Sequence, residues 1–507
     1  MNDKNKRINP IIKCDYPDPD VIRVGDTYYM ISTTMYFMPG GVILRSYNLR
    51  DWEICSYVFD CITGSDAECL RNGKSAYGQG MWAATLRFHE GKFYVAFVSH
   101  KQENTHLYTA ENIEGPWKHT TVSGYYHDLS LLFDDDGRIF IVSGNTDIRL
   151  VELDENLTGP KPGGIDKVIV RDNRDEVILG YEGAHFYKIN GKYVLTLIHW
   201  PKYNGRRTEA VFVSDRIDGT YEGRDVMWDD EGFRNSGSAQ GGLVDTPEGR
   251  WFSIVFRDSG AVGRIPVLIP VCFEEGYPIF GKEGKIPGDF YIEDNRPGYK
   301  YEPLYKSGFG GLQWQWNHVP DMKLVKLSED CLEVTTDETV VNLTYARNIL
   351  TQRTMFPACE AEVTVDGRHL QNGDFAGLCM LQSGYGFVGI HKRNDSLFLT
   401  VMKRDIKEVS YEIGKRDNEP GEIIYEVPLE GDCANVMLRA NFGEDDDSDT
   451  VDFFVRSRKG ERIHVAEPHR LMFRLDHFTG ARFGLCIFST ERAGGTASWH
   501  DFKYCIL

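Results

Sequence analysis

The stretch DYPDPDVIRVGDTYYM, residues 15–30, holds two β-rich runs, VIRV and TYYM, on either side of a Gly-Asp turn. This pattern is typical of a β-hairpin. Three aspartates, Asp15, Asp18 and Asp20, stand at its start, and Asp18 lies between two prolines, which have a restricted φ and no backbone N–H to donate. A carboxylate held in this way at the start of a strand needs a reason beyond the turn itself.

The same pattern occurs five times within residues 1–295, each time as a short β-rich run, a turn and an aromatic-rich second run. The first residues of the five copies are Asp18, Trp82, Asp128, Glu182 and Gln240. Successive copies start 64, 46, 54 and 58 residues apart, which suits a four-stranded propeller blade with its loops, given roughly 40–50 residues per blade in familiar repeats. The sequence therefore predicts an all-β fold in which residues 1–295 form a five-bladed β-propeller.

The first residue of each copy is predicted to open the innermost strand of its blade and to point towards the central axis. Three of these residues, Asp18, Asp128 and Glu182, are carboxylic acids. A single acid beside a turn is more often a turn or cap residue. Three acids at the same phase of three blades favour a catalytic cluster, because crowded like charges cost free energy and shift pKa values.

The composition of the chain indicates which classes of binding partner and which cellular compartment to expect. Lys+Arg is 57 against Asp+Glu 76, a net charge of −19, which repels nucleic-acid phosphates and anionic lipids but is indifferent to a small neutral substrate. The eleven cysteines are scattered without a CxxC pair, so neither a zinc site nor a disulfide framework is indicated. No apolar run has the length of a signal peptide or a membrane span, and a cytoplasmic protein is expected. A homo-oligomer is left open.

Paired carboxylates without metal-type His or Cys spacing suggest glycoside hydrolysis. One acid must be protonated to donate to the leaving oxygen, and the other must be ionised to activate water or attack carbon. A third carboxylate close by raises the pKa of the donor. Prolines on both sides of Asp18 limit its backbone freedom, which helps a base to keep its geometry.

The chain resembles glycoside hydrolase family 43, the β-xylosidases and α-L-arabinofuranosidases, over nearly its whole length. The motifs that carry the resemblance are NPII…PDPDVIRVGDTYY, YHDLSLLFDDDG and EGAHFYKINGKY. The resemblance implies that Asp18 is the general base, that Asp128 orients the acid and tunes its pKa, and that Glu182 is the general acid. It also implies an inverting mechanism, which requires the base and acid carboxyls to lie about 6.5–9.5 Å apart.

Further residues follow from the same resemblance as a substrate-binding set. Trp82 would form an apolar wall for the sugar ring, although a buried blade tryptophan is an equally good interpretation. Arg264, in GAVGRIPVLIPV, would hydrogen-bond the sugar. Met35 and Phe37, in MYFMPGG, are expected to line the pocket, and Met35 replaces a residue that is often Phe in family xylosidases, which leaves the choice of pentose open.

No metal or cofactor is expected to be required. Family members commonly carry a His in the fifth-blade stretch, where it supports a calcium ion in the channel or its water. This chain reads SAQGGLVD there, with Ala239 in that place, which weakens the expectation of a channel calcium. His127, next to Asp128, is an alternative supporting residue, but a lone histidine is more often a structural one.

A second domain is predicted after a linker at residues 296–310, which is rich in Gly, Pro and charge. Alternating strands over residues 311–507, such as CLEVTTD and DFFVRSR, indicate a β-sandwich. This region resembles the concanavalin-like, jelly-roll domain of many family xylosidases. The resemblance implies that one sandwich loop helps to close the pocket, which favours exo-action on short oligosaccharides.

The leading hypothesis is therefore an exo-β-xylosidase that releases xylose from the non-reducing end of short β-1,4-xylooligosaccharides. An α-L-arabinofuranosidase, or an enzyme with both activities, is the nearest alternative, and activity on the two p-nitrophenyl pentosides separates them. A carbohydrate-binding protein without activity would bind xylobiose and leave it intact. A retaining five-bladed hydrolase acting on fructans would need carboxyls about 5–5.5 Å apart and would keep the anomeric configuration.

Overall fold

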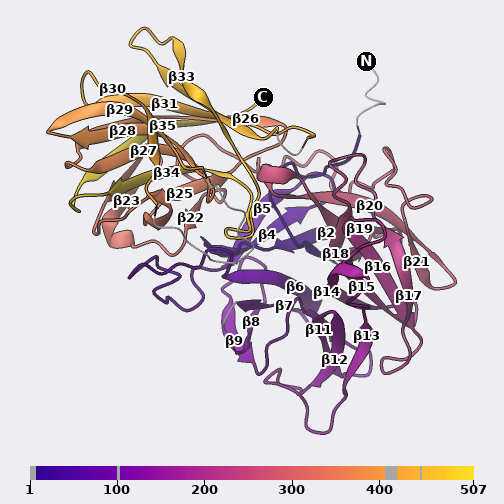
Figure 1. Ribbon diagram of the computed structural model, residues 1–507. Helices are drawn as coiled ribbons and strands as arrows, with labels where there is room; N and C mark the ends of the chain where they lie inside the picture. The colour runs from indigo at the N-terminus through magenta and orange to yellow at the C-terminus, as the bar shows by residue number, and fades with distance from the viewer. Residues whose placement is uncertain (1–6, 100–102, 406–418, 446–447) are drawn as a thin grey trace.

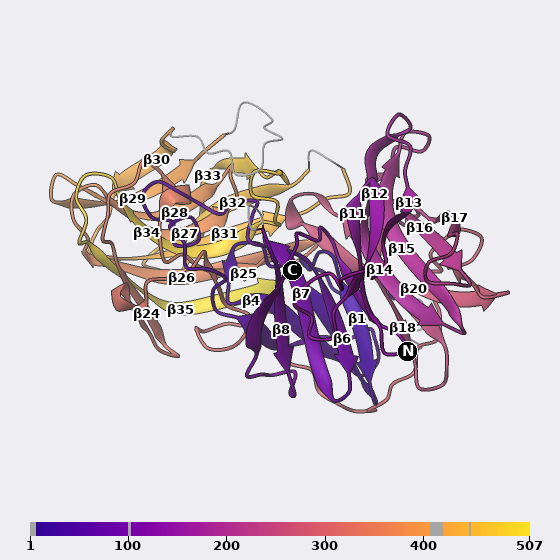
Figure 2. The same cartoon turned by 90° about the horizontal axis from the view of Figure 1, so that it is seen from below.

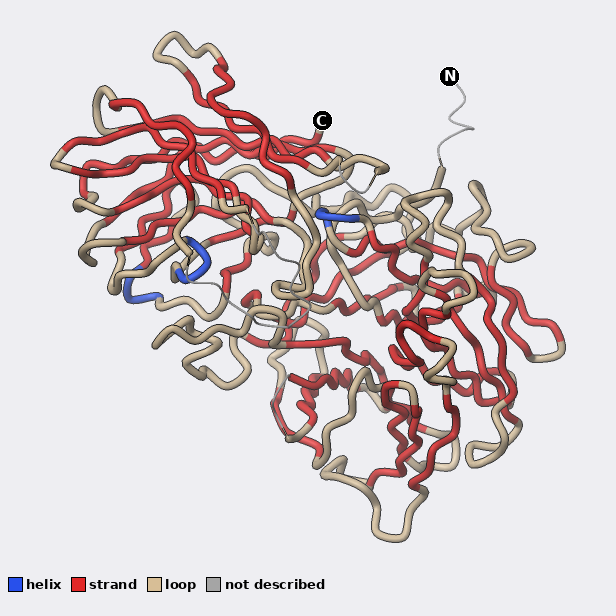
Figure 3. The backbone as a smooth tube through the Cα atoms, in the orientation of Figure 1, coloured by secondary structure: helices blue, strands red, loops and turns tan. Residues whose placement is uncertain are grey.

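The computed structural model describes residues 7–99, 103–405, 419–445 and 448–507. Nearly all of its regular structure is β-strand, drawn red in Figure 3. Helices in the described residues are single 3₁₀ turns: η1 (Gly260–Val262), η2 (Met322–Leu324) and η3 (Leu343–Tyr345). None of these helices has the length and apolarity that a membrane crossing requires. Figure 1 shows a ring of blades, coloured indigo to rose, beside a sandwich coloured orange to yellow.

Five four-stranded antiparallel sheets form the ring. Blades 1 and 2 consist of β1 (Asp20–Val24), β2 (Thr27–Ser32), β4 (Gly40–Ser46) and β5 (Glu53–Phe59), then β6 (Met81–His89), β7 (Lys92–Ser99), β8 (Thr105–Ala110) and β9 (Lys118–Val122). Blade 3 consists of β10 (Ser130–Phe133), β11 (Ile139–Asn145), β12 (Asp147–Leu153) and β13 (Asp166–Arg171). Blades 4 and 5 consist of β14 (Val177–Ile189), β15 (Lys192–Pro201), β16 (Thr208–Ser214) and β17 (Glu222–Met227), then β18 (Ser238–Asp245), β19 (Trp251–Asp258), β20 (Arg264–Glu274) and β21 (Tyr277–Phe280).

Each of the five repeated hairpins is present as the first two strands of a blade, and the predicted five-bladed propeller is confirmed. In the first hairpin, β1 pairs with β2 from Asp20↔Ile31 to Val24↔Thr27. The strand pattern arises because β-branched and aromatic side chains alternate between the two faces of each sheet and pack against the neighbouring blades. The ring closes where the backbone N–H of Gly242 in β18 donates to the carbonyl of Pro19, just before β1, at 3.0 Å.

A buried ionic group ties the inner strands together. Asp20, which is fully buried in β1, accepts hydrogen bonds from Arg87 Nη1 and Leu86 N of β6, both at 2.7 Å, and contacts His185 Nδ1 of β14 at 3.1 Å. Arg87 also donates to Ser130 Oγ of β10 at 2.7 Å. Three blades therefore meet at one buried carboxylate, and Arg87 connects a fourth blade to it.

The sandwich consists of two sheets. The first contains eight strands in the order β3 (Phe37–Met38), β22 (Gln315–Asn317), β25 (Leu350–Arg353), β34 (Arg482–Ser489), β27 (Asp374–Leu381), β28 (Gly386–Arg393), β29 (Ser396–Lys403) and β30 (Glu422–Pro428). The second contains seven, in the order β23 (Val325–Leu327), β24 (Cys331–Thr335), β35 (Thr496–Ile506), β26 (Ala358–His369), β31 (Cys433–Asn441), β32 (Thr450–Arg456) and β33 (Arg462–Arg470). The predicted β-sandwich is confirmed.

The propeller and the sandwich are joined along blade 1, as Figures 1 and 2 both show. Strand β3 comes from the β2–β4 connection of blade 1, yet it pairs with β22 of the sandwich through Trp316↔Met38 and Asn317↔Phe37. The largest apolar cluster of buried residues continues across the junction, from Tyr28 and Ile265 in the propeller to Leu378 and Trp499 in the sandwich. The two units therefore share one hydrophobic core.

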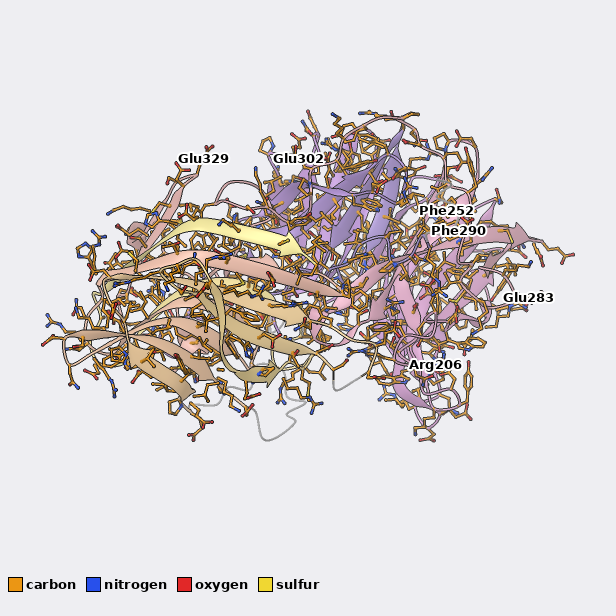
Figure 4. All side chains as sticks on the ribbon, turned by 90° about the horizontal axis from the view of Figure 1, so that it is seen from above. Arg206, Phe252, Glu283, Phe290, Glu302 and Glu329 are labelled. Atoms are coloured by element: carbon orange, nitrogen blue, oxygen red, sulfur yellow. The ribbon has the colours of Figure 1, made fainter. Side chains whose placement is uncertain are left out.

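The chain crosses between the units through residues 281–314, which contain no strand or helix. Phe290 packs on Phe252 of blade 5, with ring centroids 6.0 Å apart, and the segment then continues to Glu302 beside blade 1 (Figure 4). There Tyr299 OH donates to Glu53 at 2.6 Å. The linker predicted at 296–310 falls inside this segment, which lies along the propeller surface.

Candidate active site

The first residues of the repeats adopt unusual backbone conformations. Asp18, Asp128 and Gln240 have φ values of 52°, 47° and 58°, in the left-handed region that side chains other than Gly rarely occupy. Glu182 lies in β14, where the register against β15 shifts on both sides of it. Such distortions re-aim side chains and are concentrated at functional sites. The local backbone therefore turns these side chains away from the regular pleat.

The structure brings the three predicted catalytic acids together. Burial raises the pKa of Asp128 to about 7, and the negative charges of Glu182 and Asp18 raise it as well. One oxygen of Asp128 accepts the backbone N–H of Gly183 at 3.2 Å, which fixes this carboxyl beside the Glu182 backbone. Acids that are 110 or more residues apart in the chain, such as Asp18 and Asp128, thus share one electrostatic environment.

Asp18 is held by a partner on each oxygen. Thr33 Oγ1 donates to Oδ2 at 2.7 Å, and Arg264 Nη1 donates to Oδ1 at 2.8 Å. Its side chain is 8% exposed. Both oxygens act as acceptors, which is the state that a general base requires.

Glu182 lies in a different environment. Its side chain is 18% exposed and accepts a hydrogen bond from Asn145 Nδ2 at 2.5 Å, while His127 Nε2 lies 3.4 Å from the same oxygen. His127 Nε2 is also 3.7 Å from Asp128 Oδ2. Burial lowers the pKa of His127, but the charges of Asp128, Glu182 and Asp18 outweigh it and raise the pKa to about 9. A charged imidazole therefore stands between two of the acids.

The sequence did not identify Asn145, and it favoured a structural role for His127. Asn145 ends β11, outside the repeated hairpin motif, so only the three-dimensional arrangement of blades 3 and 4 reveals its contact with Glu182. Arg207 was also missed. Its Nε donates to Asp258, and its cation is close enough to Glu182 and Asp18 for their charges to raise its own pKa against the effect of burial.

Arg264 carries unused donors. The residue is 5% exposed, and its guanidinium lies 4.6 Å from the ring centroid of Phe478 and 5.4 Å from that of Phe256. Its Nη1 binds Asp18, whereas Nε and Nη2 have no hydrogen-bond partner among the described residues. Buried donors of this kind are costly unless a ligand satisfies them, which fits the predicted hydrogen bonds to a sugar.

Phe478 identifies the sandwich loop that reaches this region. The loop connects β33 to β34, and its His477 stacks on Tyr77 of the propeller with ring centroids 3.9 Å apart and planes 4° apart. Phe478 has a φ of 58°. The sandwich thus adds one aromatic side chain beside the arginine that binds Asp18.

The remaining predicted substrate-binding residues share one apolar cluster. Met35 and Phe37 belong to its buried part, and Trp82 and Phe478 pack against it. The Trp82 ring also meets His127 edge to face at 5.5 Å. Met35 and Phe37 are each 1% exposed, and Arg482 of the sandwich lies 3.4 Å from the Phe37 ring centroid. Phe37 therefore packs at the junction of the two units, and a sugar contact for Met35, Phe37 and Trp82 stays a prediction.

Ala239, which stands where family members commonly carry the histidine that supports a channel calcium, has apolar surroundings. Ala239 is fully buried and packs with Ile198 and Phe256, which offer no oxygen ligand for a hard cation. Among the described residues, metal-type donors converge instead at His127, Asp128 and Glu182, whose ligand atoms lie within 4.8 Å of one another. An ion bound there would occupy the oxygens of the predicted acid, so this cluster does not fit a resident cofactor of the same reaction.

Comparisons with known proteins agree with this geometry. Residues 8–278, more than half of the chain, match the model of glycosyl hydrolases family 43, and residues 305–505 match the beta xylosidase C-terminal concanavalin A-like domain. A beta-xylosidase of Formosa agariphila is 28% identical over 62% of this chain and 58% of its own length. A non-reducing end alpha-L-arabinofuranosidase of Bacteroides ovatus is 27% identical over 66% of both chains.

A solved structure described as a bifunctional GH43-CE protein of Bacteroides eggerthii is 36% identical, with a TM-score of 0.88. The alignment covers 99% of this chain and 64% of that one. The chain thus spans less than two thirds of the length of both the Formosa and the B. eggerthii proteins. The matched family model, the five-bladed ring and the clustered acids lead to one conclusion: the chain belongs to glycosyl hydrolases family 43.

Proposed function

We propose that the protein is an inverting exo-glycoside hydrolase that releases xylose from the non-reducing end of short β-1,4-xylooligosaccharides. The observation that carries this proposal is the difference between the two predicted catalytic carboxyls. Asp18 is held as a double acceptor by Thr33 and Arg264, whereas Glu182 lies beside a second carboxyl whose pKa is raised. One group is suited to remove a proton and the other to deliver one.

In this mechanism Asp18 takes a proton from a water molecule, whose oxygen attacks the anomeric carbon. Glu182 protonates the glycosidic oxygen as the bond to the leaving sugar breaks, so the anomeric configuration inverts in one step. Burial and the adjacent charge of Glu182 raise the pKa of Asp128 to about 7, so a proton is held next to the predicted acid. Arg264 holds Asp18 and offers Nε and Nη2 to sugar hydroxyls.

Exo-action on short substrates is supported by the sandwich loop. Phe478 covers Arg264 from the side of the second unit, and the stack of His477 on Tyr77 fixes that loop. A long polymer would need an open path on both sides of the cleaved bond. We therefore propose a site that accepts the non-reducing end of a short chain.

An α-L-arabinofuranosidase is the second candidate. A Bacteroides ovatus relative that is named a non-reducing end alpha-L-arabinofuranosidase favours it. That match covers 66% of this chain, whereas the match to the Formosa β-xylosidase covers 62%. A pentose pocket that binds through one arginine and an apolar wall does not itself distinguish xylopyranose from arabinofuranose. One enzyme with both activities is the intermediate outcome.

The deciding experiment is a time course of products on xylooligosaccharides and arabinose-substituted xylooligosaccharides, followed by NMR from the first turnover. The expected result is β-linked xylose released as the α-anomer from the chain end. Release of arabinose instead would establish the second candidate. Retention of configuration, or binding of xylobiose without hydrolysis, would overturn the proposal.

We also propose that catalysis needs no bound metal ion, because the surroundings of Ala239 are apolar. Full activity is expected after dialysis against EDTA, measured as kcat/KM on p-nitrophenyl β-xyloside. Loss of activity that calcium restores, and magnesium does not, would contradict this proposal.

A further inference from the structure

The turn that delivers Arg264 to the site is held from outside the propeller. Arg264 is the first residue of β20 and follows the turn Ser259–Gly263, in which Gly260 and Gly263 have φ values of 68° and 106°. Within the turn, Ser259 N donates to Gly263 O at 2.9 Å. Gly263 N also donates to Gly260 O, at 3.0 Å. The two backbone groups of Ala261 are instead bound by residues distant in the sequence.

The sandwich supplies two of these contacts. Asp449, just before β32, accepts the backbone N–H of Ala261 on Oδ2 at 2.7 Å. On the other side of the same residue, Ala481 N, just before β34, donates to Ala261 O at 2.8 Å. Both backbone groups of Ala261, three residues before Arg264, therefore end on the second unit.

Asp449 is itself fixed by burial and charge. It is 1% exposed, and its Oδ1 accepts Arg234 Nη2 of the propeller at 2.6 Å, with both side chains at most 5% exposed. A buried ion pair with satisfied hydrogen bonds holds its geometry firmly, and removal of one partner leaves an uncompensated charge. The turn is also tightly enclosed, since a Cβ on Gly260 would lie 1.9 Å from Arg234 Nη1 and 2.4 Å from Asp449 Oδ2.

Asp15 completes the clamp from the N-terminal segment. Its Oδ1 accepts the backbone N–H of Arg264 at 2.8 Å, and its Oδ2 accepts that of Gly480 in the sandwich at 2.9 Å. The carboxylate thus links the arginine backbone to the loop that carries Phe478. Arg264 and Phe478, the two side chains that face each other across the junction, share one buried support.

We infer that Asp449 is a positioning residue for hydrolysis, which acts through the 259–263 turn to hold the guanidinium of Arg264 against Asp18. The sandwich then contributes to catalysis by positioning Arg264. This inference rests on the proposed function, because Arg264 matters to turnover only if the site binds a sugar. A group placed about 1 Å out of position can cost on the order of 10²-fold in rate.

The test compares Asp449→Ala, Asp449→Asn, Arg264→Ala and the double variant Arg264→Ala/Asp449→Ala. The matched control is Asp321→Ala, which removes another ion pair between the units, Arg71 to Asp321 at 3.0 Å, together with the contact of Asp321 to Arg347 at 3.4 Å. We expect Asp449→Ala to lower kcat/KM about 10²-fold, chiefly through KM, with Asp321→Ala close to wild type. Asp449→Asn keeps an oxygen for Ala261 N and should recover much of the loss.

The double variant separates positioning from general stability. If Asp449 acts through Arg264, the double variant is no slower than Arg264→Ala alone, within about threefold, because the pathway is already broken. A full further loss in the double variant, or an Asp449→Ala enzyme as active as Asp321→Ala, would overturn the inference. Should Asp449→Ala fail to fold, the comparison is made on the smaller loss that Asp449→Asn causes, and a loss of the same size in the wild-type and Arg264→Ala backgrounds overturns the inference. Wild-type enzyme that hydrolyses no pentoside would instead refute the proposed function.

Discussion

At the residue scale, the three aspartates of the opening hairpin have three separate roles. Asp18 is the predicted base and binds Arg264, Asp20 ties the inner strands of the propeller, and Asp15 links the Arg264 backbone to the sandwich. Asp18 precedes β1 and has a φ of 52°, so its side chain does not follow the alternation of the strand that Asp20 begins. Six residues of sequence thereby connect the channel, the pocket and the second unit.

Glu182→Ala should lose activity in proportion to the need for a proton on the leaving group. Xylobiose, whose leaving alkoxide must be protonated, is expected to lose about 10³-fold or more in kcat/KM, and p-nitrophenyl xyloside much less, since general acid catalysis is typically worth 10²–10⁴-fold. Glu222→Ala, an exposed acid in the same blade, is the control. Unchanged xylobiose hydrolysis by Glu182→Ala would remove Glu182 from its role.

The alkaline side of the pH–rate profile should report the carboxyls at blades 3 and 4. The pKa of Asp128 is raised to about 7 by burial and by the charges of Glu182 and Asp18, so kcat/KM is expected to fall above about pH 7 as the site loses its proton. The charge on His127 lowers this pKa. His127→Asn removes that charge, and the alkaline limb should move to higher pH by roughly one unit. A limb that moves to lower pH would contradict the assignment.

The sequence predicted that the three acids converge, but it did not predict which other residues contact them. The reason is physical. Asp18, Asp128 and Glu182 could be identified because each occupies the same phase of a repeated hairpin, so the fold itself predicts that they converge. Asn145 and Arg207 follow no repeat, and their contacts depend on how far one blade is rotated against the next. Asp449 acts across the two units, 185 residues from the arginine it supports, and no local pattern marks it.

At the element scale, the buried ionic group around Asp20 stabilises the propeller, in addition to the apolar packing between blades. Burial raises the pKa of Asp20, but Arg87 and His185 outweigh that effect and lower it to about 2. A carboxyl with a lowered pKa contributes stability that is present above its ordinary value of 3.8 and lost as the pH falls through about 2. The inner strands β1, β6 and β14 are therefore held together throughout the neutral range.

Asp20→Asn should destabilise the protein by about 3 kcal/mol at pH 7, because it leaves Arg87 buried without its charge partner. The measurement is urea unfolding followed by tryptophan fluorescence. Asp26→Asn is the matched control, since Asp26 forms an ion pair with Arg296 in which both side chains are about half exposed. Equal stability of the two variants would show that the buried ionic group around Asp20 contributes little to the free energy of unfolding.

Strands whose side chains alternate clearly between apolar and polar could be predicted from the sequence. A strand that forms only because another strand pairs with it could not. The repeated hairpins and sandwich strands such as DFFVRSR carry their own alternation of side chains. Strand β3 has two residues, Phe37 and Met38, and exists because β22 lies beside it. The pairing of Phe37 with the sandwich, and the position of Arg482 beside its ring, were therefore not predicted, while its predicted sugar contact stays a prediction.

At the scale of the whole molecule, the propeller and the sandwich share one hydrophobic core. The principal apolar cluster includes Tyr28 and Ile265 on one side of the junction and Leu378 and Trp499 on the other. Residues 1–303 expressed alone should therefore aggregate or unfold at much lower temperature than the full chain, because they expose apolar surface that the sandwich normally covers. Solubility and thermal unfolding of the fragment are the measurements. A soluble fragment with wild-type kcat/KM would show that the sandwich is dispensable.

The pairing of β3 with β22 also limits how such proteins exchange parts. A sandwich taken from a relative would have to accept a foreign two-residue edge through its backbone and a foreign aromatic ring beneath its buried arginine. Chimaeras cut at the chain crossover alone would break this match. Recombination should therefore succeed only when the short β2–β4 connection of the first blade travels together with the sandwich that receives it.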